Sequence, residues 1–93
     1  MEIQQINHTK KGYFEAVEDG KQAGQMTYTW AGNDKFIIDH TEVSPDFNGK
    51  GVGKKLVMAS VEYARANNVK IIPLCPFAKS VFDKVEEIRD VLS

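Results

Sequence analysis

The alternation of apolar and polar residues in the N-terminal half of the chain predicts antiparallel strands. Residues 13–18 form an extended run that ends at Asp19-Gly20, a dipeptide that tolerates the positive φ angles of a type I′ turn. In the run that follows, Met26, Tyr28 and Trp30 alternate with polar residues, which is the period of a strand with one buried face. We therefore predict a hairpin in this part of the chain.

Two further segments extend the predicted sheet. Residues 31–34 contain glycine, asparagine and aspartate and reverse the chain. The β-branched run at residues 36–43 suits a central strand. Residues 2–7 predict a shorter first strand, so the N-terminal half is expected to form an antiparallel meander.

The C-terminal half changes to a helical period. Apolar residues recur at helical spacing from Val52 to about residue 66, so this helix should pack against one face of the sheet. Residues 69–74 then read as a strand that runs parallel to strand 36–43, because a long helix separates the two. Residues 77–85 and 86–92 predict one or two short helices. The expected apolar stripe of the first consists of Phe77, Val81, Phe82 and Val85.

These elements together predict an α/β fold. Its mixed sheet has about five strands, in which the antiparallel meander is followed by a parallel strand-loop-helix-strand unit. At 93 residues the chain has room for one domain, which we expect to span residues 1–93.

Charge and composition exclude several classes of function. Twelve Lys and Arg residues against thirteen Asp and Glu residues leave a net charge of −1, so we expect no nucleic acid partner. No apolar run approaches the roughly 20 residues that cross a membrane. The first residues lack the basic region and apolar core of an export signal, so we expect none. The single cysteine cannot form an internal disulfide. We expect a cytoplasmic protein with a free thiol and no membrane partner.

The segment from residue 48 to residue 55, Asn-Gly-Lys-Gly-Val-Gly-Lys-Lys, carries the strongest motif. It is not a nucleotide P-loop, because Lys55 stands where a Ser or Thr should hold magnesium. It is not a Rossmann fingerprint, because Lys54 replaces the third glycine. Glycines before a helix still allow a close approach of the backbone to an anion, which the first-turn amides attract. A phosphate-bearing ligand is therefore expected, and the alternative is an ordinary strand-to-helix turn.

The arrangement resembles the GNAT (general-control-type) N-acetyltransferases, whose coenzyme A loop reads Q/R-x-x-G-x-G/A between a central strand and a helix. Residues 48–53 fit this pattern except that Asn48 replaces Gln or Arg. The resemblance is strongest to a short branch of about 90–100 residues, with a Phe-x-Gly-x-Gly-Val-Gly loop and a Cys-Pro-Phe after the last strand. Against full-length members, the chain lacks the two helices between the first and second strands, which build much of the acceptor site.

The resemblance implies acetyl-coenzyme A as the cofactor. Its diphosphate would bind the amides of the loop, and its pantetheine arm would lie between the two central parallel strands beside the backbone of Glu42 and Val43. The side chains of Lys50, Lys54 and Lys55 could also pair with its phosphates. The cofactor-binding residues expected on this basis are Glu42, Val43, Asn48, Gly49, Lys50, Gly51, Val52, Gly53 and Lys54.

Cys75 is the first candidate for a catalytic residue. It follows the predicted strand 69–74 and stands between Pro73 and Pro76, at the strand end where ligands bind in sheets with parallel pairs. The resemblance places this thiol beside the cofactor sulfur, where it could accept the acetyl group or form a mixed disulfide with coenzyme A. The alternative is a small buried hydrophobic residue.

His40 is the second candidate. Strand alternation places it on the same face as Phe36, Ile38 and Glu42. An imidazole at this position could take the proton of an attacking ammonium near neutral pH, and Glu42 is a second candidate base. The alternative is a histidine that only satisfies its hydrogen bonds on the sheet.

The function predicted from the sequence is acetyl-coenzyme A-dependent N-acetylation of a small amine or a lysine-like amine in a peptide. One alternative is a coenzyme A-binding module without turnover, which acts as a sensor or interaction protein. A third possibility, a pure interaction domain, requires an idle glycine loop. The sequence specifies neither the acceptor nor the oligomeric state.

Overall fold

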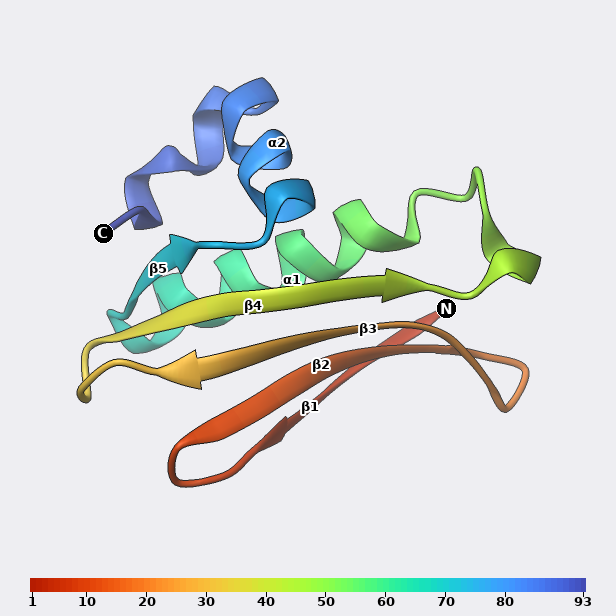
Figure 1. Cartoon of the computed structure of the whole chain (residues 1–93), viewed down its shortest axis with the longest axis horizontal. Coiled ribbons are helices and arrows are strands. Elements are labelled where there is room, and N and C mark those ends of the chain that lie inside the picture. The colour runs from red at the N-terminus through yellow and green to blue at the C-terminus, as the bar shows by residue number, and fades with distance from the viewer.

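The elements of the chain follow the predicted order. The computed structural model describes residues 1–93. Its strands are β1 (Glu2–Asn7), β2 (Lys11–Glu18), β3 (Lys21–Trp30), β4 (Lys35–Val43) and β5 (Lys70–Pro73). Its helices are the 3₁₀ turn η1 (Pro45–Phe47), α1 (Val52–Asn67), α2 (Pro76–Lys84) and the 3₁₀ helix η2 (Glu86–Val91) (Figure 1).

The strands form one mixed sheet in the order β1-β2-β3-β4-β5. The first four pair antiparallel, whereas β4 and β5 run parallel. Asp19 and Gly20 have φ angles of 52° and 76°, so the predicted turn between β2 and β3 adopts the positive angles that this dipeptide tolerates. The prediction of an antiparallel meander followed by a parallel unit is confirmed.

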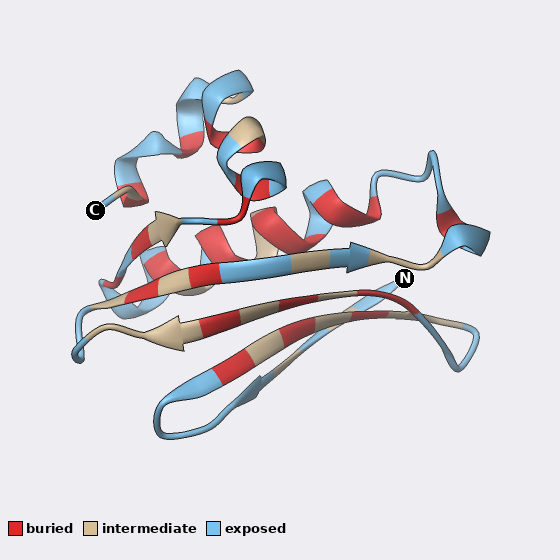
Figure 2. Ribbon diagram, in the orientation of Figure 1, coloured by how far each residue is buried: buried red, intermediate tan, exposed pale blue.

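One face of the sheet carries the core. The long helix α1 contacts β2, β3 and β4 from that side (Figure 1). The residues buried on this face include Met26, Tyr28, Phe36 and Ile38. The ring centres of Tyr28 and Phe36 lie 4.7 Å apart. Exposed and half-buried residues alternate with these along the strands (Figure 2). The opposite face of the sheet therefore remains open to solvent.

The C-terminal segment packs against α1 and β5. Ala78, Val81 and Phe82 form the buried side of α2. Phe77, which the sequence placed in this apolar stripe, is 42% exposed, so that part of the prediction is wrong. The reason is its position in the first turn of α2, where it projects toward the start of α1 instead of into the core.

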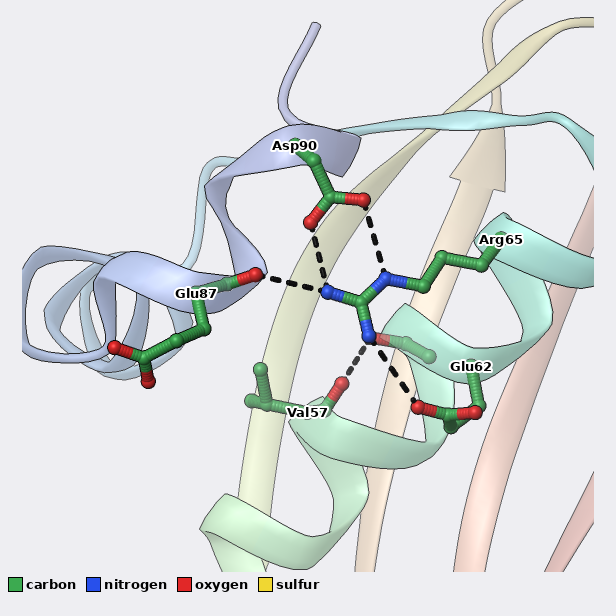
Figure 3. A network of polar contacts seen from close by, with 6 residues as sticks. Val57, Glu62, Arg65, Glu87 and Asp90 are labelled. Carbon is green, nitrogen blue, oxygen red and sulfur yellow. Dashed lines mark hydrogen bonds and ion pairs between the residues drawn. The ribbon is translucent and has the colours of Figure 1, made fainter.

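Arg65 ties the last turn of α1 to η2. Its guanidinium donates two hydrogen bonds to the carboxylate of Asp90, at 2.8 and 3.1 Å, and one to the backbone carbonyl of Glu87 (Figure 3). The backbone N–H of Ser93 donates to the carbonyl of Ile71 at 3.0 Å, which pairs the end of the chain with β5. These contacts cover part of the free edge of the sheet.

None of the helices combines the length and apolar character needed to cross a membrane.

Candidate functional site

The loop between β4 and α1 is shaped by two glycines. Gly49 and Gly51 have φ angles of 79° and 71°, which residues with a side chain rarely adopt. A Cβ atom built on either glycine has no neighbour within 4 Å. The loop therefore needs glycine for its backbone angles, and the space in front of both residues is open.

A hollow of about 230 Å³ opens at the start of α1. Its lining comes from the end of β4, from the loop and from the first turns of α1 and α2. These residues are Val43, Phe47, Asn48, Gly49, Gly51, Val52, Gly53, Lys54 and Phe77. Seven of the nine residues predicted to bind the cofactor are among them, and the other two, Glu42 and Lys50, are not.

The electrostatics of this hollow suit an anion. The first-turn N–H groups of a helix have no partner within the helix, and they carry the positive end of its dipole. No acidic side chain lies in the first turn of α1, whereas Lys54 lines the hollow itself. Lys50 lies beside it, with its Nζ atom 5.3 Å from the centre of the Phe47 ring. A diphosphate therefore fits the charge, the backbone and the open space of this site.

The parallel strands separate before β4 reaches this hollow. The pairing of β4 with β5 runs from Lys35 opposite Lys70 to Ile38 opposite Pro73. One more backbone hydrogen bond follows, from the N–H of Cys75 to the carbonyl of Ile38 at 3.0 Å. The chain then enters α2, and β4 continues toward the glycine loop without a strand at this side (Figure 1). The backbone near Val43 is therefore not covered by β5.

Cys75 occupies the N-cap position of α2 and is 4% exposed. Its sulfur lies 3.5 Å from the hydroxyl oxygen of Thr41 on β4. Burial raises the pKa of this thiol, but hydrogen bonds from the Ala78 amide, the Thr41 hydroxyl and the Phe77 amide together outweigh that effect, so the pKa is lowered. The free thiol is thus placed among donors that stabilise a thiolate.

His40 lies on the face opposite to the one predicted. Tyr28 pairs with Ile38, but Thr27 pairs with His40, so β4 holds one extra residue, Asp39, between them. This bulge reverses the alternation of the strand. His40 is therefore exposed although Ile38 is buried, and the prediction that they share a face is wrong.

Glu42 shares the open face with His40, as predicted. The Nε2 atom of His40 lies 3.0 Å from Oε1 of Glu42, and both side chains are mostly exposed. Thr41, between them, points to the other side and reaches Cys75. The side chains of the two predicted catalytic residues, His40 and Cys75, thus lie beside the same stretch of β4 but on opposite faces of the sheet.

Sequence reasoning missed three residues of this site. Phe47 and Phe77 line the hollow, and Thr41 contacts the thiol. Phe77 stands in the Cys-Pro-Phe run, but its apolar side chain at helical spacing predicts a core residue. Thr41 had no signal of its own, because its direction depends on the bulge at Asp39.

Comparisons with known proteins identify a family and a solved structure to which this chain is similar. The family model described as GCN5-related N-acetyl-transferase matches residues 13–91. A GCN5-like protein from Staphylococcus aureus, solved by NMR, is 41% identical, with 99% of this chain and 87% of that chain covered and a TM-score of 0.71. No curated protein matches the sequence.

More distant structures share the fold. The ribosomal-protein-alanine N-acetyltransferase of Brucella melitensis has a TM-score of 0.72 at 19% identity, and the match covers 84% of this chain but 62% of that one. The aminoglycoside N-acetyltransferase AAC(6′)-Iy, solved in complex with coenzyme A, has a TM-score of 0.64 at 16% identity, with 89% and 88% covered. The chain thus spans less than two thirds of the Brucella enzyme.

Proposed function

The chain belongs to the GCN5-related N-acetyltransferase family, and on this basis we propose that it binds acetyl-coenzyme A and acetylates an amine. The observation that carries the proposal is the hollow at the start of α1. It combines two glycines with positive φ angles, open space in front of both and a helix N-terminus without an acidic residue. This combination fits a diphosphate and serves no evident purpose in an idle turn.

The residues that would hold the cofactor follow from the lining of the hollow. Backbone amides between Gly49 and Lys54 would bind the phosphate oxygens, apart from the Lys50 amide, which donates to the Phe47 carbonyl at 3.3 Å. Charge-assisted hydrogen bonds of this kind contribute about 1.5–3 kcal/mol each. Lys54 would add its positive charge from the rim. The backbone of β4 near Glu42 and Val43, which β5 leaves uncovered, would pair with the arm that carries the sulfur.

Bound acetyl-coenzyme A supplies an acetyl thioester that a neutral amine can attack. His40 would act as the base that takes the proton of the incoming ammonium, with Glu42 at 3.0 Å to stabilise the resulting imidazolium. A backbone N–H of β4 would donate to the developing oxyanion. Cys75, whose pKa is lowered, would act either as an acyl relay or as the neighbour of the leaving thiol.

The acceptor is proposed to be a small amine or a lysine-like amine in a peptide. The distant structural neighbours act, by their names, on an alanine of a ribosomal protein and on aminoglycosides, and both substrates present an amine. An open sheet face beside His40 gives such an amine access from solvent. An exposed face favours a protruding side chain or chain end as the acceptor.

Three measurements test the proposed cofactor, the turnover and the role of Cys75. Calorimetry with acetyl-coenzyme A should give saturable binding, and a panel of amines and peptides should release free coenzyme A thiol. If Cys75 is an acyl relay, acetyl-coenzyme A alone should add one acetyl mass to the wild type and none to Cys75→Ala. No heat of binding at millimolar acetyl-coenzyme A would contradict the proposed cofactor.

A second candidate function is coenzyme A binding without turnover. The placement of His40 and Cys75 on opposite faces of β4 favours it, together with the 4% exposure of the thiol. Such a module would bind the cofactor in calorimetry but release no thiol with any amine. The thiol-release panel therefore separates the two functions.

A further inference from the structure

Phe77 is an exposed aromatic residue in the wall of the hollow. It is 42% exposed, although it stands in an amphipathic helix whose other large apolar residues are largely buried. Its ring packs against the first turn of α1, where a Cβ atom built on Gly53 would lie 2.5 Å from the ring atom Cζ. The ring therefore rests on the backbone of Gly53, and only glycine leaves room for it there.

The same residue reaches the other end of the site through its backbone. The Phe77 amide is one of the donors that lower the pKa of the Cys75 thiol. Its ring meanwhile contacts Gly53 in the first turn of α1, which lines the hollow. Phe77 thus lies between the candidate phosphate site and the candidate thiol site.

We infer that the Phe77 ring forms the apolar wall along which the pantetheine arm of coenzyme A binds. This inference rests on the proposed function, because it assumes that one ligand places its phosphates at α1 and its sulfur near Cys75. An arm that joins these two points would run beside Phe77, whose ring contacts Gly53 in α1 and whose amide lies at the Cys75 thiol. The arm carries two methyl groups and several methylenes, and covering an exposed ring with such groups removes apolar surface from water.

The neighbouring exposed residue Leu74 provides a contrast. It is 69% exposed and lies only three residues earlier, but it does not line the hollow. If coenzyme A contacted any exposed apolar side chain in this region, both residues would contribute to its binding. If the arm binds along the wall of the hollow, only Phe77 contributes.

The first test compares two ligands in calorimetry. Phe77→Ala should bind coenzyme A roughly tenfold more weakly than the wild type. This is the loss expected when the exposed half of an aromatic side chain is no longer there to be buried by the ligand. It should bind adenosine 3′,5′-bisphosphate, which lacks the arm, with unchanged affinity. Phe77→Leu, which keeps an apolar side chain, should lose less, and Leu74→Ala should bind both ligands like the wild type.

The outcomes are separable. If the wild type binds no coenzyme A, the proposed function fails. If the wild type binds it and Phe77→Ala binds it equally well with an unchanged circular dichroism spectrum, only this inference fails. An equal loss for both ligands would also overturn it, since the ring would then act on the phosphate loop and not on the arm.

The second test uses the contact with Gly53. Gly53→Ala should displace the ring, because the added Cβ would overlap it, and should therefore weaken coenzyme A binding in the wild-type background. In the Phe77→Ala background the same substitution should have little further effect, since no ring remains to be displaced. Additive losses would show that Gly53 acts independently of Phe77 and would contradict the inference.

Discussion

The sulfur of Cys75 lies 3.5 Å from the hydroxyl oxygen of Thr41, and this contact joins the N-terminus of α2 to the C-terminal part of β4. Both residues stand where β4 and β5 separate. The hydroxyl can accept a hydrogen bond from the thiol and can donate one to the thiolate. This contact connects the chemistry of the thiol to the position of β4.

Replacing Thr41 with valine should raise the pKa of Cys75. The hydroxyl is one of the donors that lower this pKa against the opposing effect of burial, so its removal favours the neutral thiol. The rate of alkylation by iodoacetamide as a function of pH reports the thiolate fraction, and its midpoint should move to higher pH. Thr27→Val, on the open face of β3, is the control and should leave the midpoint in place. An unchanged midpoint in Thr41→Val would show that the backbone donors alone set the pKa.

Gly51→Glu should abolish coenzyme A binding in a protein that remains folded. The new carboxylate would project into the hollow and repel phosphate, and it would strain a residue whose φ is 71°. Gly20→Glu is a matched control, because Gly20 has a φ of 76° and equally open space but lies in the turn between β2 and β3. Calorimetry should show wild-type affinity for the control alone. Equal affinity in both variants would refute the phosphate loop.

His40→Gln should lower turnover by roughly 10²-fold and leave the affinity for coenzyme A unchanged. The glutamine keeps the size and polarity of the side chain but cannot take a proton from the amine. His8→Gln, which alters the other histidine of the chain, should retain full activity. Thiol-release rates between pH 6 and 9 measure the effect. A variant that keeps wild-type rates throughout this range would place the base elsewhere.

Asp90→Asn should lower the thermal unfolding temperature at neutral pH. Hydrogen bonding to Arg65 lowers the pKa of Asp90, so the charged carboxylate contributes stability above the unfolded-state pKa of about 4, and this contribution is lost as the pH falls through the folded-state pKa. The difference between wild type and variant should therefore shrink in acid. Asp46→Asn, at an exposed residue without an ion pair, should show a smaller difference at neutral pH. A gap that stays constant from pH 7 to pH 2 would exclude this linkage.

The hairpins, the long helix and the glycine loop could be predicted from the sequence because their signals are local. Asp19-Gly20 selects a turn by its own backbone angles, and α1 follows from apolar residues at helical spacing. The loop at residues 48–53 likewise depends on glycines at positions where φ is positive. Each of these features is decided by residues that are neighbours in the chain.

The faces of β4 and the place of Phe77 were decided by the tertiary structure. The bulge at Asp39 arises from the register between β3 and β4, so His40 turned to the open face and Thr41 to Cys75. Phe77 has the apolar character of a core residue, but the packing of α2 beside Gly53 places its ring in the hollow. A strand's alternation and a helix's apolar stripe specify directions only relative to their own element. Pairing between strands and packing between helices set the absolute directions, and these contacts join residues that are distant in the sequence.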